Sequence, residues 1–144
     1  MKEVLNKLKE FHTVYGHPIE TEPTTQSNEV AELRYRLGKE ELDEYLEANL
    51  NDDPIEVADA LADQLYILLG TMLAHGMHNV IEDVFDEVHR SNMSKLGEDG
   101  KPILREDGKV MKGPNYFTPN IGKIINGEWE RNRTQLQIPF DEKV

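Results

Sequence analysis

The sequence of 144 residues contains no cysteine. This absence excludes disulfide bonds and thiolate ligands to metals, and it fits a reducing cytoplasm, where we expect the protein to reside. Long hydrophobic runs are lacking too, because Asp63, Gln64 and His75 interrupt the longest apolar stretch. That stretch is too short and too polar to cross a bilayer, so we expect no membrane-spanning segment.

Positive charge is scarce. The chain has 16 Lys and Arg residues against 28 Asp and Glu residues, which gives a formal net charge of −12. Such a protein repels the phosphates of DNA or RNA, so we expect no nucleic-acid polymer as partner. A small phosphorylated substrate is compatible with this charge if metal ions lie between it and the carboxylates. Acidity can also serve solubility alone, so the placement of the acids decides.

Apolar residues at helical spacing predict four helices, which together favour an all-α four-helix bundle. The first helix covers about residues 2–15 and stops at Gly16. The second begins near Ser27, which we predict to be its N-cap, and continues to about Leu50.

The third and fourth helices have clearer start signals. The third is predicted over about residues 54–75, with Pro54 in its first turn and Gly76 after its end. For the fourth, Asn79 and Glu82 have the spacing of an N-cap box, and the helix reaches residues 95–96.

Beyond Gly97 the sequence is rich in turn signals. Residues 98–101, Glu-Asp-Gly-Lys, recur at 106–109, which predicts two turns flanking a short strand over residues 102–105. A last short helix is expected after Asn120. We therefore predict one domain over residues 1–126, with a helical core at about 2–96, a turn-rich lid or arm at about 97–120, and a polar tail over 127–144.

Two glutamates of the second helix occupy positions where a core residue is expected. Glu41 and Glu44 fall on the same helical stripe as Leu37 and Ala48, and Glu40 lies at the edge of that stripe. Surface glutamates normally occupy the face opposite the apolar stripe. A solvated face is therefore the less favoured interpretation for Glu41 and Glu44.

The third helix is apolar nearly all round, yet Asp59 and Asp63 share one narrow stripe with Tyr66. Two buried carboxylates close together are costly unless a cation neutralises them. A hydrogen bond to Tyr66 or to a helix terminus is the simpler alternative. The all-oxygen donor set favours Mg²⁺ or Mn²⁺ over iron, because no Glu-x-x-His pair is present.

On the fourth helix, Asn92 and Lys95 continue an apolar inner stripe. Lys95 could pair with the acids or reach a phosphate, and Asn92 could contact a sugar or base. Lys95 could equally extend its ammonium group to solvent.

These motifs resemble those of the MazG-like all-α nucleotide pyrophosphohydrolases, which include phosphoribosyl-ATP pyrophosphohydrolases and dimeric dUTPases. The resemblance covers about residues 27–120. It rests on Glu40-Glu41-x-x-Glu44, on residues 61–66, on residues 84–95 and on Lys112-Gly113-Pro114. The signature of the superfamily continues with Glu-x-x-Asp. This chain has Ala60 three residues before Asp63, so Asp59 is the expected substitute ligand.

The resemblance implies the all-α NTP pyrophosphatase fold. It also implies Mg²⁺-dependent hydrolysis of a nucleoside or deoxynucleoside triphosphate to the monophosphate and pyrophosphate. The corresponding biological role would be dUTPase-like or house-cleaning. It assigns catalysis to Glu40, with substrate contacts from Asn92, Lys95 and Tyr66. The implied metal ligands are Glu41, Glu44, Asp59 and Asp63. It also implies a homodimer or homotetramer, which the all-round apolar third helix favours.

Two alternatives remain open from the sequence. The acidic stripes could belong to a non-enzymatic helical interaction module that binds basic residues of a partner. The protein could also be a pyrophosphohydrolase that acts on a noncanonical phosphorylated metabolite.

Overall fold

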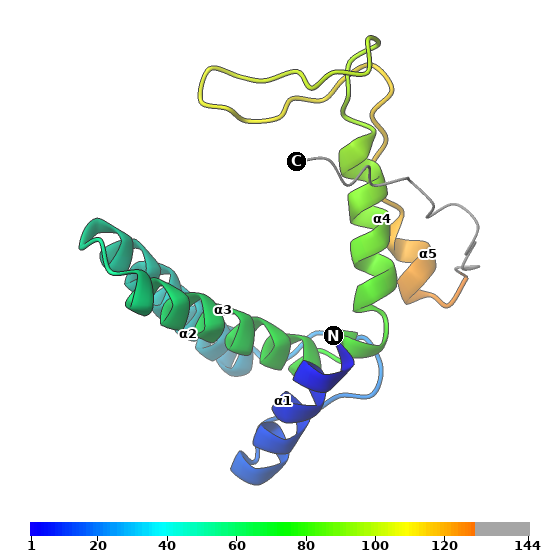
Figure 1. Ribbon diagram of the computed structural model, residues 1–144. Coiled ribbons are helices and arrows are strands. Elements are labelled where there is room, and N and C mark those ends of the chain that lie inside the picture. Colours follow the sequence, from blue (N-terminus) through cyan, green and yellow to red (C-terminus); the bar gives the residue numbers. More distant parts are fainter. Residues whose placement is uncertain (129–144) are drawn as a thin grey trace. The chain divides into compact units, whose positions relative to one another are not determined.

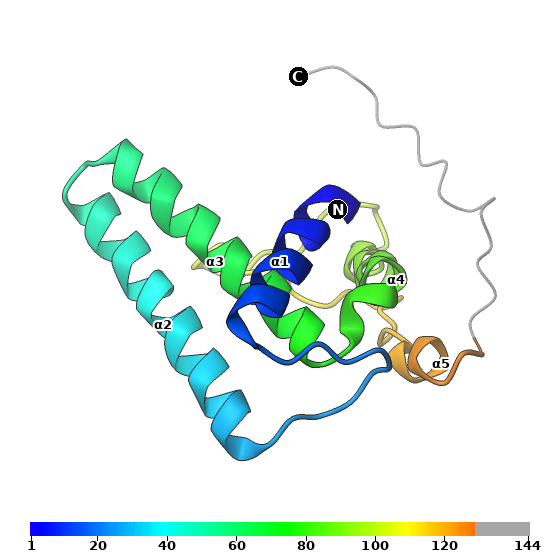
Figure 2. The same cartoon turned by 90° about the horizontal axis from the view of Figure 1, so that it is seen from below.

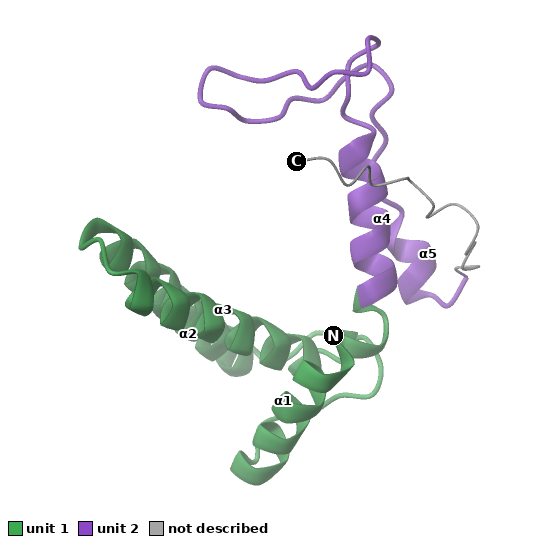
Figure 3. Ribbon diagram, viewed as in Figure 1, with its two compact units in different colours: residues 1–81 green, residues 82–144 purple. Residues whose placement is uncertain are grey.

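The protein is all-α, as the sequence predicted (Figure 1). The computed structural model describes residues 1–128, so nearly all of the predicted tail lies outside the described residues. Its elements are α1 (Lys2–Tyr15), α2 (Asn28–Leu50), α3 (Pro54–Ala74), the 3₁₀ turn η1 (Met77–Asn79), α4 (Ile81–Met93) and α5 (Ile121–Ile125). The chain forms two compact units, residues 1–81 and 82–144 (Figure 3), and each is considered by itself.

In the first unit, α2 and α3 form an antiparallel hairpin (Figure 2). The turn between them follows the predicted signals. Asp52 adopts a left-handed conformation with φ of 55°. The Asp53 side chain then accepts hydrogen bonds from the backbone N–H groups of Ile55 and Glu56, at 3.0 and 3.1 Å, and Pro54 opens the helix. These bonds satisfy donors that the first turn of a helix leaves without intrahelical partners.

Arg34 joins the two helices of the hairpin at the end opposite the turn. Its Nε donates to Thr71 Oγ1 at 3.0 Å, and its Nη2 donates to the carbonyl oxygen of Ile67 at 2.6 Å. Gly70 leaves the space for this contact, because a Cβ at that position would lie 2.5 Å from Arg34 Nη2 and 2.7 Å from His12 Nε2. Nearer the middle of the hairpin, Gln64 Nε2 donates to the carbonyl oxygen of Glu41.

A small apolar core joins α1 to α3. It consists of Leu5, Leu8, Leu69 and Leu73. His12 is buried beside this core, and its Nδ1 lies 2.9 Å from the carbonyl oxygen of Pro18. Burial lowers the pKa of His12 because it disfavours the charged imidazolium.

One side of the hairpin is apolar and exposed in a single copy. Its large side chains are Tyr35, Leu42, Leu46, Leu61, Leu65 and Leu68. By length and composition alone, α3 could cross a membrane. Core helices of globular proteins pass the same test, and Asp59 and Asp63 fall within this helix. The exposed leucines instead indicate a surface that needs a cover.

In the second unit, Glu87 anchors the segment before α5 to α4. The Glu87 carboxylate is buried, accepts two hydrogen bonds from Arg90 at 2.8 and 2.9 Å, and accepts a third from the backbone N–H of Asn120 at 2.8 Å. Ser91 Oγ donates to the carbonyl oxygen of Phe117. The expected short helix after Asn120 is present as α5, and the Asn120 side chain accepts from the N–H of Lys123.

Two local predictions were wrong. Asn79 does not cap α4, because it belongs to the 3₁₀ turn η1. Its Nδ2 donates to the carbonyl oxygen of Thr21. The Asn79 side chain is therefore held by the loop before α2 and not by the first turn of α4. The predicted strand over residues 102–105 is reduced to one antiparallel bridge between Leu104 and Val110. The two Asp-Gly turns are too close together to leave room for a longer ladder.

The crowding at Gly70 gives a stability prediction. Gly70→Ala should lower the free energy of unfolding by about 1–3 kcal/mol, because the new methyl group must displace the Arg34 guanidinium and its two hydrogen bonds. Gly38→Ala is the matched control in the same hairpin: its Cβ would contact only Ile67, at 3.9 Å. That variant should match or exceed the wild-type stability in urea denaturation. Equal losses in both variants would rule out the proposed role of Gly70.

Candidate functional site

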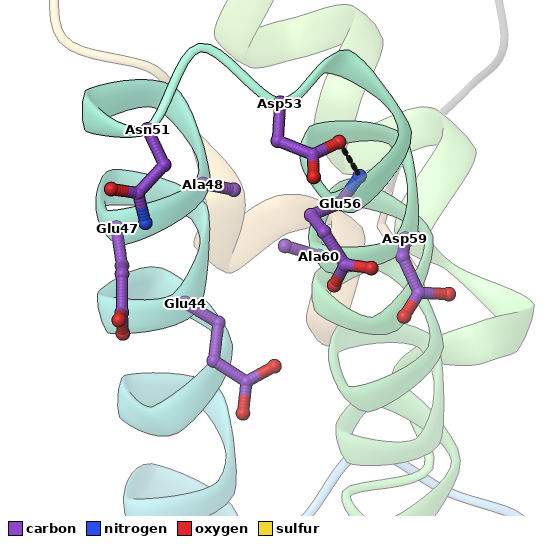
Figure 4. A pocket seen from close by; sticks show the side chains of 8 residues that line it. All are labelled: Glu44, Glu47, Ala48, Asn51, Asp53, Glu56, Asp59 and Ala60. Carbon is purple, nitrogen blue, oxygen red and sulfur yellow. Dashed lines mark hydrogen bonds between the residues drawn. The ribbon is translucent and has the colours of Figure 1, made fainter.

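Carboxylates from both helices of the hairpin line a pocket of about 360 Å³ near the α2–α3 turn. Figure 4 shows the side chain of Glu44 extending from α2 toward α3, and the side chains of Glu56 and Asp59 on α3. The complete lining is Glu44, Glu47, Ala48, Asn51, Asp53, Glu56, Asp59 and Ala60. The lining includes no lysine or arginine, so the pocket is strongly electronegative.

Glu41 is the most constrained of the acids. Its Oε2 atom is buried, and no hydrogen-bond partner reaches it among the described residues. Burial is the main cause that raises its pKa, and the negative charges of Glu44, Asp63, Glu40 and Asp59 raise it further. A proton or a cation at this oxygen would relieve the cost of its burial.

The same electrostatic interactions show which predicted residues lie together. Glu40, Glu44, Asp59 and Asp63 all act on Glu41. Glu44 and Asp59 also line the pocket. The carboxylates therefore form one continuous group, from Glu41 in the helix–helix contact to the pocket near the turn. This grouping agrees with the shared stripes that the sequence indicated.

Glu56, which is not among the residues predicted from the sequence, also lines the pocket, together with Asp59. Glu56 stands three residues before Asp59, so residues 56–59 contain the Glu-x-x-Asp pattern that was sought at Ala60 and Asp63. The pattern is present in the sequence, but the prediction placed it at Ala60 and Asp63 instead. Glu47 is exposed on α2 and lines the same pocket.

Ala60 lies where a longer side chain has little room. Ala48 and Ala60 are both buried, with 7% and 3% of their surface exposed, and both line the pocket between the helices (Figure 4). Small side chains here let α2 and α3 approach closely. The acids that flank Ala60 on the same helix, Glu56, Asp59 and Asp63, extend from more open positions.

The donor chemistry of this group suits a hard divalent cation, because every ligand atom is a carboxylate oxygen. The partnerless Oε2 of Glu41 fits such an ion. In their present positions, however, no three Asp, Glu or His side chains within residues 1–128 converge closely enough to enclose one. Glu44, Asp59 and Asp63 are exposed, so their side chains have open space in which to change rotamer.

Tyr66 follows Asp63 by one helical turn and packs against α1. Its ring meets Phe11 edge to face, with centroids 5.4 Å apart, and His17 stacks on the other part of Phe11 at 5.8 Å. About a third of Tyr66 remains exposed. The contact with Phe11 explains the burial of Tyr66 without a ligand, so its substrate role stays a prediction.

Asn92 and Lys95 belong to the second unit and are not among the residues that the hairpin brings together. Asn92 is exposed on the last turn of α4, and Lys95 is half-buried just beyond the end of that helix. Their predicted contacts with a substrate therefore remain predictions.

The crowded carboxylates should cost stability, and Glu41 gives the test. The pKa of Glu41 is higher in the folded state than in the unfolded chain. Protonation of Glu41 therefore stabilises the fold at pH values below the unfolded pKa, and this stabilisation is lost as the pH rises through the folded pKa. In chelator at neutral pH, Glu41→Gln should therefore melt about 2–4 °C higher than the wild type. The difference should shrink as pH falls toward 4. A variant that melts lower than the wild type at neutral pH would contradict this account.

Comparisons with known proteins identify the family. The family model of phosphoribosyl-ATP pyrophosphohydrolase matches residues 8–92. No curated protein matches the chain. Among solved structures, the chain is similar to a protein from Exiguobacterium sp. 255-15 that is provisionally assigned as an NTP pyrophosphohydrolase. The two sequences are 25% identical, and the match covers 87% of this chain and 92% of that one, with a TM-score of 0.45. The acidic hairpin of α2 and α3 lies within the matched residues, and the chain belongs to the phosphoribosyl-ATP pyrophosphohydrolase family of nucleotide pyrophosphohydrolases.

Proposed function

We propose that this protein hydrolyses a nucleoside or deoxynucleoside triphosphate to the monophosphate and pyrophosphate in the presence of Mg²⁺, with Mn²⁺ as an alternative. The observation that carries the proposal is the buried Oε2 of Glu41, which has no hydrogen-bond partner within residues 1–128 and lies within a group of four further acids. A purely structural carboxylate at this place would be expected to have a hydrogen-bond donor. An interaction module would be expected to pair its acids with cations.

Glu41, Glu44, Asp59 and Asp63 are the proposed cation ligands, and Glu56 joins them from the Glu-x-x-Asp pattern. When bound, the cation supplies charge neutralisation for the phosphate oxygens and makes a water molecule more acidic. Without this neutralisation, the carboxylates would repel a triphosphate.

Glu40 is the proposed general base. It is exposed at the edge of the group and near enough to raise the pKa of Glu41, so a water molecule from solvent can reach it. In the proposed step the water oxygen bonds to the α-phosphorus and the bond from that phosphorus to the α–β bridging oxygen breaks. The water proton passes to Glu40, and pyrophosphate leaves with the bonding electrons.

Contacts with the nucleoside are proposed separately for each unit. Tyr66 and Phe11 present an aromatic edge one helical turn from Asp63, which suits a base. Asn92 and Lys95 are proposed for the sugar and the phosphates. A dUTPase-like or house-cleaning role follows from the same resemblance. A noncanonical phosphorylated metabolite is the second candidate substrate, since the acids contact only the phosphates and cation.

The proposal predicts a sharp dependence on the carboxylates. Pyrophosphate release from a panel of nucleoside and deoxynucleoside triphosphates should require Mg²⁺ or Mn²⁺ and disappear in chelator. Glu41→Gln and Glu56→Gln should each lower kcat by about 100-fold or more. Glu32→Gln is the matched control, because Glu32 is exposed on α2 but lies on the side away from the acidic group.

The result for Glu56 discriminates between two alignments of the signature. Loss of activity in Glu56→Gln with little change in Asp63→Asn would place the Glu-x-x-Asp pattern at residues 56–59. The reverse would support Asp59 and Asp63 as the α3 ligands without Glu56. Absence of pyrophosphate release from every nucleotide, with either cation, would refute the canonical substrate and leave the noncanonical metabolite to be tested.

We further propose that two copies associate through the exposed apolar side of the hairpin. A groove there is lined by residues of both helices, including Leu42, Leu61, Leu65 and Leu68. The acids of the candidate site lie on other faces, so two copies can approach here without strong repulsion. Paired hairpins would form a four-helix bundle from two chains. The absence of cysteine supports a cytoplasmic location for this assembly.

Leu65→Glu tests this association, because it places a charge on the apolar side. Sedimentation equilibrium should show a dimer or tetramer for the wild type and at least a tenfold weaker association for Leu65→Glu, the effect of about 1.4 kcal/mol. Val14→Glu is the control, since Val14 is 72% exposed on α1, outside the groove. A monomeric wild type at micromolar concentration would refute the proposed dimer.

A further inference from the structure

We propose that Gln64 is a positioning residue of the acidic group, which holds Glu41 in register with the acids of α3 so that they can share one cation. The identity of this group as a cation site rests on the proposed function. The positioning itself rests on the hydrogen bonds that join α2 to α3.

Gln64 reaches from α3 to the backbone of α2. Its Nε2 donates to the carbonyl oxygen of Glu41 at 3.2 Å. Glu41 lies inside α2, so the same carbonyl oxygen also accepts an intrahelical bond from the N–H four residues later. A carbonyl oxygen has two lone pairs, and the Gln64 amide uses the one that the helix leaves over. The contact therefore serves the pairing of the two helices and not the stability of α2 alone.

This contact leaves the Glu41 carboxylate available. The Gln64 amide bonds to the backbone of Glu41, whereas the Oε2 of the same residue is buried and has no hydrogen-bond partner within residues 1–128. An amide that donated to the carboxylate would satisfy that oxygen and compete with a cation for it. Gln64 thus fixes the position of Glu41 without using the oxygen that the proposed cation needs.

A second polar contact joins the same helices two turns away. Arg34 precedes Glu41 by seven residues on α2, and Thr71, which accepts from Arg34 Nε, follows Gln64 by seven residues on α3. Seven residues are about two helical turns, so the two contacts lie on one side of the helix pair, about 10 Å apart. Together they fix the register of the hairpin, because a slide of one helix by one residue would break both.

Of these two contacts, the one made by Gln64 is at the acids. Asp63, the residue before Gln64, is one of the acids whose charge acts on Glu41. Gln64 also lines the apolar groove of the hairpin, so it stands where the acidic group meets the apolar side. Loss of its hydrogen bond would loosen the pairing at the acids, while Arg34 would still hold the helices together further along.

Cation binding depends on such positioning because several carboxylates must meet one ion. Glu41 comes from α2, whereas Asp59 and Asp63 come from α3, so the distances between them follow from the register of the two helices. Replacement of a residue that orients metal ligands commonly weakens metal binding by about 10- to 100-fold. A chain without the Gln64 bond would have to restore the register when it binds a cation, which weakens binding.

The test is Mn²⁺ binding by the full chain at neutral pH, measured from the electron paramagnetic resonance signal of the free ion. Gln64→Met removes the hydrogen-bond donor, keeps an unbranched side chain and adds no charge to the apolar groove. This variant should bind Mn²⁺ about tenfold more weakly than the wild type. Gln64→Leu, which also lacks the donor but has a different shape, should show the same loss.

Gln26→Met is the matched control. Gln26 Nε2 donates to the carbonyl oxygen of Ala74 at the C-terminal end of α3, so the same substitution removes a bond of the same kind away from the acids. It should lower the melting temperature, as Gln64→Met does, but leave the affinity for Mn²⁺ unchanged. An equal loss of affinity in Gln26→Met, or wild-type affinity in both Gln64 variants, would overturn the positioning role.

Activity separates this inference from the proposed function. Weaker Mn²⁺ binding by the Gln64 variants of a protein that hydrolyses no nucleotide would keep the positioning role and refute the enzyme. If hydrolysis is observed, Gln64→Met should need about tenfold more Mn²⁺ for half-maximal rate and reach a kcat close to that of the wild type at saturation. A lowered kcat with an unchanged Mn²⁺ requirement would overturn the inference, and so would a wild type that binds no Mn²⁺.

Discussion

The pairing of α2 with α3 is the constraint on which the first unit depends. Arg34 fixes one end of the pair through the backbone and side chain of α3, and the Asp53 cap fixes the turn at the other. Between them, Ala48 and Ala60 are buried at the contact. Once the two helices are held in this register, their carboxylates lie together and their leucines lie together. The acidic group and the apolar side are therefore two results of the same packing.

The helices and the acidic grouping could be predicted from the sequence because both follow from short-range rules. Helical spacing places Glu41 with Glu44 and Asp59 with Asp63, and Asp53-Pro54 marks a helix start with strong local chemistry. The N-cap predicted at Asn79 was wrong because the side chain of Asn79 donates to the carbonyl oxygen of Thr21 in a distant loop. No local sequence pattern shows such a contact. Glu56 was missed for another reason: the Glu-x-x-Asp pattern was sought only at Ala60 and Asp63, one helical turn further along α3.

The charge of the hairpin pocket bears on the proposed substrate. The pocket has acids and no cations in its lining. A phosphorylated substrate would be repelled by these acids, so the proposed function depends on a cation that neutralises them.

The raised proton affinity of Glu41 also makes the acidic group sensitive to competition. Glu41 lies in the middle of α2, where burial and the neighbouring acids raise its pKa. It therefore binds a proton more readily than an exposed glutamate does. The proposed cation would compete with a proton for Glu41, so its uptake would be coupled to proton release. Occupancy of the site would then follow the acidity of the surroundings as well as the concentration of the metal.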